Sequence, residues 1–159
     1  MRKVAIASLS LSLALSLSAC GAGQTAATRM TSQVTDGVES TITVDGNDLK
    51  VSGLLLVAQP DGSAVLVASM VNNAQTEDAL LGISIGGVIA TLPAKNLPLK
   101  QNAPLNFAGD SANASALAVG VKAVAGTRLP VYLFFARAGE MKLDALVLDK
   151  RGIYAGVGA

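Results

Sequence analysis

The sequence contains no histidine, no tryptophan and a single cysteine, Cys20, among its 159 residues. Histidine is the usual general base near neutral pH and the commonest metal ligand, so its absence removes the commonest routes to acid–base catalysis and to metal binding. The charges nearly cancel, with 12 basic and 11 acidic residues, and no basic stripe is present to follow a phosphate backbone. We therefore expect a protein that is not an enzyme, binds no cofactor and does not bind nucleic acid.

The N-terminal segment has the pattern of a bacterial lipoprotein signal. Arg2 and Lys3 are followed by an apolar run over 4–17 that is interrupted only by serines, and then by the lipobox Leu-Ser-Ala-Cys ending at Cys20. The apolar run is about 14 residues, or roughly 21 Å as a helix, whereas a membrane span needs about 20 residues. We expect residues 1–19 to be removed and the Cys20 sulfur to carry diacylglycerol. An ordinary cleaved secretory signal and a retained anchor are the alternatives.

Lipidation of Cys20 predicts where the protein is located. Each buried CH₂ contributes about 0.8 kcal/mol, and two acyl chains suffice for stable anchoring. The mature chain would be held at the extracytoplasmic face of the cell membrane, with no cysteine left for a disulfide. Small polar residues predict that 20–40 is a lipidated flexible tether. The remaining residues, 41–159, suit one domain, and the mature chain has a net charge of −1 once Arg2 and Lys3 are removed.

Short β-rich runs separated by turn residues dominate the rest of the chain. The turn signal Gln59-Pro60-Asp61-Gly62 separates two of them, and no run shows a helical stripe with caps. This pattern of short runs and turns predicts an all-β fold, a two-sheet antiparallel β-sandwich of the Ig type in one domain. The expected strands are 41–44, 49–58, 64–72, 79–91, 103–107, 116–123, 129–136 and 141–149.

The run 129–136 is apolar on both faces. Its odd positions are Leu, Val, Leu and Phe, and its even positions include Tyr132 and Phe134. Pro130 favours an edge or the start of a strand. Either a loop covers the second face, or that face is an exposed apolar patch that docks a partner. Tyr132 and Phe134 are the candidate partner contacts.

The segment Gly82-Ile83-Ser84-Ile85-Gly86 fits the G-x-S-x-G pattern of a nucleophile elbow. An elbow needs a strand–turn–helix context and a histidine to accept the serine proton. Ser84 lies inside an expected strand and the chain has no histidine. We therefore interpret the glycines as marking a bulge or a close approach of another segment.

Three charged motifs have ordinary structural explanations. Asp45-Gly46-Asn47-Asp48 lacks the later ligands of an EF-hand and is expected to be a tight turn. Glu77 and Asp78 are expected to be solvated in a loop. The basic, proline-containing segment 95–100 is expected to be a loop that could touch anionic lipid or a partner.

Two stretches resemble PCuAC-type periplasmic copper chaperones. Residues 71–74 and 77–82 resemble that family's N-x-G…A-D-x-L-x-G stretch. Residues 124–131, with the Phe134-Phe135 pair and Ala138-Gly139-Glu140, resemble its ending x-x-G-D-x-V-P-L-T-L-x-F-x-x-A-G. Together with the lipobox, the chain resembles the LpqE-like actinobacterial lipoproteins, over roughly 50–150.

The resemblance implies a cupredoxin-like β-sandwich and a copper(I) site made of two histidines and two methionines, ending in a His-x-Met pair. Lining up the closing segments places that pair at Asn113 and Ser115, and 88–103 contains neither residue type for the first two ligands. The resemblance therefore implies the fold without the metal site. A divergent copper chaperone using Met70, Met141 or a borrowed ligand is the alternative.

LpqE-like lipoproteins are associated with the outer face of the respiratory bc–aa3 supercomplex, so the resemblance also implies a partner. The resulting hypothesis is a non-enzymatic surface lipoprotein that docks on a membrane protein complex. Membrane lipid, held through Cys20, would be its second partner.

Overall fold

The computed structural model describes residues 36–158. The predicted signal, Cys20 and the tether up to residue 35 lie outside the described residues. Within 36–158 the only helical element is the 3₁₀ turn η2 (Gly152–Tyr154), and no helix there could cross a membrane. The strands are β1 (Val38–Ile42), β2 (Leu49–Ala58), β3 (Ala64–Asn72), β4 (Asp78–Ile85), β5 (Val88–Ile89), β6 (Leu97–Leu99), β7 (Leu105–Asn106), β8 (Leu117–Ala118), β9 (Arg128–Phe135) and β10 (Glu140–Leu148).

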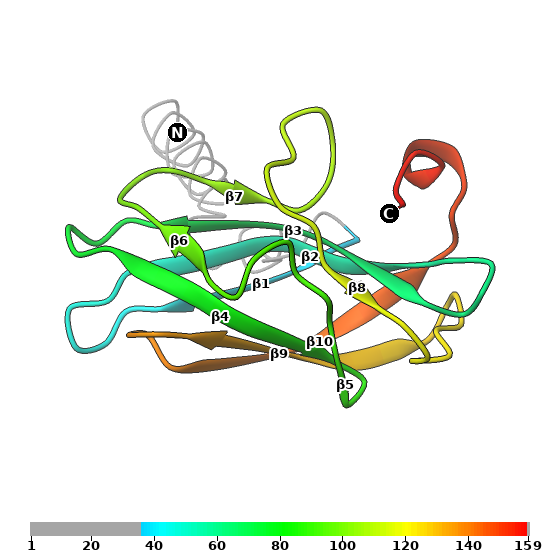
Figure 1. The fold of residues 1–159 in the computed structure, drawn as a ribbon, viewed down its shortest axis with the longest axis horizontal. Helices are drawn as coiled ribbons and strands as arrows, with labels where there is room; N and C mark the ends of the chain where they lie inside the picture. Colours follow the sequence, from blue (N-terminus) through cyan, green and yellow to red (C-terminus); the bar gives the residue numbers. More distant parts are fainter. Residues whose placement is uncertain (1–35, 159) are drawn as a thin grey trace, which may run out of the picture. The chain divides into compact units, whose positions relative to one another are not determined.

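The strands form two layers that face each other (Figure 1). The first layer contains β1, β2, β3, β7 and β8, and the second contains β4, β5, β6, β9 and β10. The layers join where β10 runs parallel to β2, with Val147 opposite Leu56. On the opposite side, the backbones of Leu117 in β8 and of Thr91, which follows β5, exchange hydrogen bonds of 2.7 and 3.1 Å. The sheet therefore curls around one core, which confirms the predicted all-β, Ig/cupredoxin-like sandwich. The prediction that all strands pair antiparallel fails at one place, because β10 and β2 are parallel.

The core lies between the layers and follows the alternation of the strands. In β10 the side chains of one face are buried and those of the other face are not, as the sequence predicts. Burying each Val, Leu, Ile, Phe or Met side chain contributes roughly 1.5–3 kcal/mol. The inward residues of β3, β9 and β10 are Ala64, Leu66, Ala68, Met70, Val131, Leu133, Phe135, Met141, Leu143, Ala145 and Val147.

The long central strands match the expected ranges closely. β2 and β3 have the predicted bounds, and β9 and β10 differ from theirs by one residue at each end. The link at 59–62 is the predicted turn, because the Gly62 N–H donates to the Gln59 carbonyl at 2.9 Å. The Ser63 hydroxyl and N–H donate to Asp61, and these hydrogen bonds lower the pKa of the Asp61 carboxyl.

Four of the expected strands need correction. The run 79–91 is a hairpin, because Gly86 and Gly87 adopt φ of 56° and 84° and reverse the chain between β4 and β5. The run 116–123 is a strand only at Leu117–Ala118, because Gly120 and Lys122 turn with positive φ. The run 103–107 shortens to β7, and the run 41–44 is β1, which begins at Val38 and ends at Ile42.

The segment 95–100 contains a strand that sequence reasoning missed. Leu97 and Leu99 point inward and are buried, whereas Pro98 is exposed. β6 pairs with β4 alone, so it is an edge strand, where a proline without an N–H is tolerated. The expected loop is therefore wrong at 97–99.

The C-terminal segment 150–158 lies over the outer face of the first layer. Val57 and Val65 are directly opposed in β2 and β3 and point away from the core, yet both are buried. Tyr154 and Val157 line the same pocket as Val65, and the Gln59 side-chain amide donates to the Val157 carbonyl at 3.4 Å. This segment, called the C-terminal cover below, therefore contributes a second, smaller apolar cluster outside the core.

A contact with the beginning of the described chain secures the C-terminal cover. The Tyr154 hydroxyl donates a hydrogen bond to the Asp36 carboxylate. Burial, then the negative charge of Asp36, then this hydrogen bond raise the pKa of Tyr154 above its ordinary value of 10.0. The neutral phenol is therefore the form that the folded protein favours.

Candidate functional site

The two predicted partner contacts lie on the outer face of the second layer. Because Val131, Leu133 and Phe135 point into the core, Tyr132 and Phe134 of the same strand point outward. Phe134 is 38% exposed, and no loop of residues 36–158 buries it. Whether the two residues contact a partner stays a prediction.

The strand register places further apolar side chains beside them. Ser84 stands opposite both Tyr132 and Ile89, so these three residues share one face, and Ile89 is 81% exposed. Phe134 stands opposite Gly82, next to Leu81, which is 48% exposed. We call Leu81, Ile89, Tyr132 and Phe134 the candidate docking face.

Charged residues of β10 border this face. Lys142 is directly opposite Tyr132, and its ammonium nitrogen lies 5.4 Å from the centroid of the tyrosine ring. A cation over an aromatic ring at an exposed site contributes roughly 0.5–1 kcal/mol, so Lys142 helps to fix the ring. Glu140 is opposite Phe134 on the same strand. An apolar centre with charged residues at its border is the usual composition of a protein interface.

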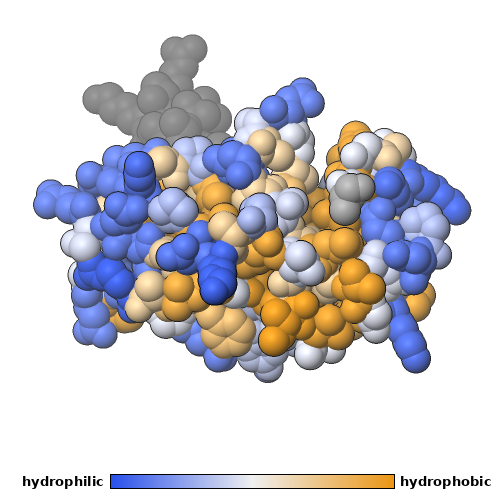
Figure 2. Space-filling view, in the orientation of Figure 1, coloured by the Kyte–Doolittle hydropathy of each residue, from blue (hydrophilic) through white to orange (hydrophobic). Residues whose placement is uncertain are grey.

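Apolar surface also gathers around the seam between the layers. Figure 2 shows a hydrophobic region over β5 and β8, with hydrophilic residues toward both ends of the molecule. Its exposed members include Ile89 of β5 and Val119, which follows β8. Sequence reasoning missed Ile89 and Leu81. The Gly86-Gly87 turn could have identified Ile89, because a hairpin there returns β5 alongside β4.

Ser84 has no elbow geometry. It lies in the body of β4, one residue before the strand ends, rather than on a turn into a helix. Gly82 stands at a register shift between β4 and β9, which is a β-bulge. A Cβ on Gly86 would lie 2.8 Å from Val121, so only glycine fits there. The interpretation of these glycines as a bulge and a close approach is confirmed.

Asp78 is not solvated, which corrects the prediction for this residue. It is the first residue of β4 and is 6% exposed. Its carboxylate accepts hydrogen bonds from the backbone N–H groups of Arg137 at 2.9 Å, Ala138 at 3.0 Å and Ala79 at 2.7 Å. Asp78 therefore holds the turn between β9 and β10, whereas its neighbour Glu77 is exposed.

Asn72 has a comparable role at the end of β3. Its buried side-chain amide donates to the carbonyls of Thr76 and Leu99, both at 2.9 Å, and its oxygen accepts from the Ala74 N–H at 3.0 Å. Asn72 and Asp78 both belong to the segments that resemble the PCuAC-type chaperones. Their contacts show that these motif residues stabilise the fold.

The two positions that the resemblance aligns with the His-x-Met pair follow β7. Asn113 accepts a hydrogen bond from the Asn106 N–H at 2.8 Å and donates one to the Pro104 carbonyl at 3.0 Å, so its amide holds this loop. Ser115 lines a pocket on the outer face of β3.

The Asp45–Asp48 segment is the predicted tight turn, with positive φ at Asp45 and Gly46.

Comparison with known proteins supports the fold class. No protein-family model matches the chain, and no curated protein sequence matches it significantly. The copper-bound PCuAC domain from PmoF2 is similar in structure, with 21% identity, a TM-score of 0.59, and coverage of 70% of this chain and 98% of that domain. The apo PCuAC domain from PmoF1 shows 24% identity, a TM-score of 0.58, and coverage of 69% and 98%.

A further structure, the apo PmoF2 PCuAC domain, shows 19% identity, a TM-score of 0.56, and coverage of 71% and 98%. At these identities the likeness establishes the fold, a copper-chaperone-like β-sandwich, rather than the activity.

The described residues do not fit a copper(I) ion. Copper(I) prefers soft thioether and thiolate ligands or imidazole. The chain has no histidine, and Met70 and Met141 are both buried in the hydrophobic core. Among residues 36–158, no group of three or more His, Cys, Asp or Glu side chains could hold a metal. The side chains of residues 36–158 therefore provide no copper(I) site.

Proposed function

We propose that this protein is a non-enzymatic lipoprotein, anchored at the extracytoplasmic face of the cell membrane through Cys20, which docks on a membrane protein complex. The candidate docking face is the observation that carries the proposal. It presents two aromatic and two aliphatic side chains at outward positions, three of them more than a third exposed. Aromatic residues dominate the energetics of protein interfaces, and monomeric proteins rarely leave such groups together in solvent without a role.

The lipid anchor would make a modest docking face sufficient. A domain held at the membrane meets a membrane complex at a high effective concentration, so weak contacts give stable association. The resemblance to LpqE-like lipoproteins, in which the copper ligands would be missing, makes the respiratory bc–aa3 supercomplex the first complex to examine, with the protein as an accessory subunit.

The docking proposal is tested by purification from detergent-solubilised membranes. We expect wild-type protein to co-purify with one membrane complex and to crosslink to it in intact membranes. The double variant Ile89→Ser, Phe134→Ser should reduce recovery of the complex about tenfold or more, since interface hot spots contribute 2 kcal/mol or more. Val44→Ser removes a 60% exposed aliphatic residue from the β1–β2 turn and should leave recovery unchanged.

Recovery of wild-type protein as a free monomer would contradict the docking proposal, and so would equal recovery of the complex with the double variant. Cys20→Ser separates the two parts of the proposal. Produced without residues 1–19, this variant has neither the acyl group nor the apolar signal and should not attach to the membrane, while crosslinking to the complex is retained at high added concentration.

The likeness to a copper-bound PCuAC domain favours one second candidate, a divergent copper chaperone. Copper(I) titration of the purified protein distinguishes the two. The burial of Met70 and Met141 predicts a dissociation constant weaker than about 1 μM. Tighter binding that Met70→Leu or Met141→Leu abolishes would establish copper handling instead.

A further inference from the structure

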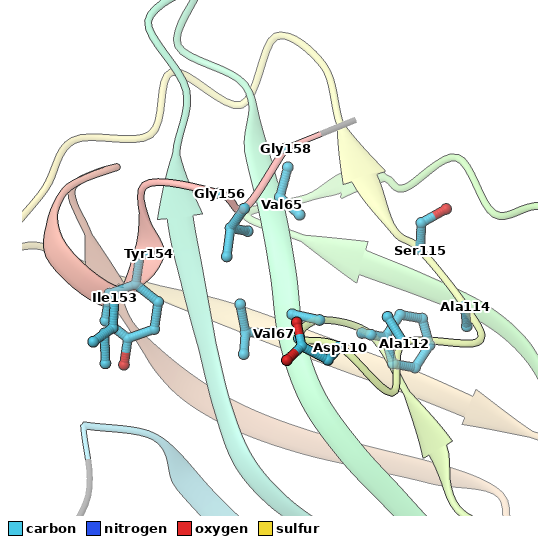
Figure 3. Close-up of a pocket in the computed structure, with 14 residues that line it drawn as sticks. Val65, Val67, Asp110, Ala112, Ala114, Ser115, Ile153, Tyr154, Gly156 and Gly158 are labelled. Carbon is cyan, nitrogen blue, oxygen red and sulfur yellow. The ribbon is translucent and has the colours of Figure 1, made fainter.

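A pocket of about 580 Å³ lies on the outer face of the first layer, away from the candidate docking face. The C-terminal cover forms one wall and the loop 107–115 forms the other, and Figure 2 shows hydrophobic surface between these two projections. The floor is the outward face of β3. Figure 3 shows the apolar side chains that line it, among them Val65, Val67, Ala112, Ala114 and Ile153.

The pocket carries one charged group without a partner. The Asp110 carboxylate belongs to the loop wall and lies near Val67 in Figure 3. Within residues 36–158 it makes no hydrogen bond and no ion pair. A second carboxylate, Asp36, is bound to the hydroxyl of Tyr154 on the opposite wall. The C-terminal cover contains two basic residues: Lys150 donates to the Gln59 side chain at 3.1 Å, and Arg151 pairs with Asp149 at 3.2 Å.

We propose that this pocket binds a small amphiphile with a linear apolar body and one cationic end. The volume falls in the range of about 300–1,000 Å³ that small-molecule sites occupy, and such sites combine apolar walls with a few polar groups. The apolar body would lie on Val65 and Val67, with the cationic end beside Asp110. An anionic amphiphile of the same length would meet uncompensated negative charge there.

The test uses two probes with the same tail, decyltrimethylammonium and decyl sulfate, below their micelle concentrations. The protein is the chain 20–159 with Cys20→Ser, which contains all of the described unit. Tyr132→Phe leaves Tyr154 as the only tyrosine in a chain without tryptophan, so intrinsic fluorescence reports on the pocket wall. We expect the cationic probe to bind about three- to fivefold more tightly, as an exposed ion pair allows.

Two variants and one control locate the site. Asp110→Asn should reduce the preference for the cationic probe to less than about twofold. Gly156 lines the pocket, its φ is not positive, and a Cβ there meets no atom within 4 Å, so Gly156→Leu should fill the pocket and weaken both probes roughly tenfold. Gly82→Leu, at another glycine without positive φ on the other layer, should change neither affinity.

Equal affinity for the two probes would overturn the proposal, as would unchanged binding to a folded Gly156→Leu variant. If Gly156→Leu does not fold, Asp110→Asn decides alone, because this exposed residue makes no contact that the fold requires. Loss of probe binding leaves the docking proposal intact, because the two surfaces belong to different layers.

Discussion

The outer faces of the two layers carry similar side chains but differ in what lies over them. On the first layer, Val57 and Val65 point away from the core and are buried, and Tyr154 and Val157 of the C-terminal cover line the same pocket as Val65. On the second layer, Phe134 and Ile89 also point outward, and residues 36–158 provide no such cover. Outward apolar residues in a strand therefore have two different meanings, and only the position of distant segments distinguishes them.

The largest expected effect comes from uncovering the first layer. Truncation after Asp149 removes the C-terminal cover, including Tyr154 and Val157, and exposes Val65; a side chain of this kind contributes roughly 1.5–3 kcal/mol when fully buried. We expect the free energy of unfolding to fall by about 3 kcal/mol and a hydrophobic dye to bind the folded protein. Chemical denaturation and dye fluorescence measure both. Unchanged stability would show that the cover contributes no packing.

The second effect concerns the hairpin that carries Phe134. Asp78→Ala leaves the N–H groups of Arg137 and Ala138 without their acceptor, which should cost about 2–3 kcal/mol. Glu77→Ala removes the neighbouring exposed carboxylate and should change stability by less than about 0.5 kcal/mol. Equal effects of the two substitutions in urea unfolding would refute the proposed role of Asp78.

A smaller effect on stability is expected at the uncovered face itself. Phe134→Ser removes a side chain that is already 38% exposed, so unfolding should become easier by only about 1–2 kcal/mol, although recovery of the membrane complex should fall strongly. This separation of stability from binding is what distinguishes a docking face from a covered face. A loss of stability as large as that of the C-terminal truncation would erase the distinction.

The smallest effect is a dependence on alkaline pH. Because burial and Asp36 raise the pKa of Tyr154, its stabilising contribution is complete below about pH 10 and is lost as the pH rises through the folded-state pKa. Tyr154→Phe should remove this part of the alkaline decline, and Tyr132→Phe should keep it. The decline is followed by thermal unfolding between pH 8 and 11. Identical profiles for wild type and Tyr154→Phe would contradict the assignment.

The long strands could be predicted from sequence because their signal is local. β2 and β3 are long runs of β-forming apolar residues on the two sides of the Gln59–Gly62 turn, which marks the end of one strand and the start of the next. β5 and β6 are too short to show the two-residue alternation of a strand. Their positions depend on the Gly86-Gly87 reversal and on pairing with β4, which are tertiary facts.

The residues of the candidate site could be predicted less completely. Tyr132 and Phe134 were identified because two apolar faces in one strand are unusual. Asp78 was predicted to be solvated, since nothing local shows that the β9–β10 turn, almost sixty residues later in the chain, will present N–H groups to it. The C-terminal cover was not anticipated either, because its glycine-rich sequence has no strand or helix pattern.

The parallel contact between β2 and β10 also constrains the order of assembly. β2 emerges early and can pair with β1 and form a hairpin with β3 at once, but at Leu56 and Val57 it pairs with β10, the last strand of the described residues. Pairings so distant in sequence are slow to form, because the whole intervening loop must be closed first. A chain that emerges N-terminus first therefore cannot join its two layers through β10 until nearly all of it is present. A premature stop before residue 140 would remove β10 and leave the two layers without the strand that joins them.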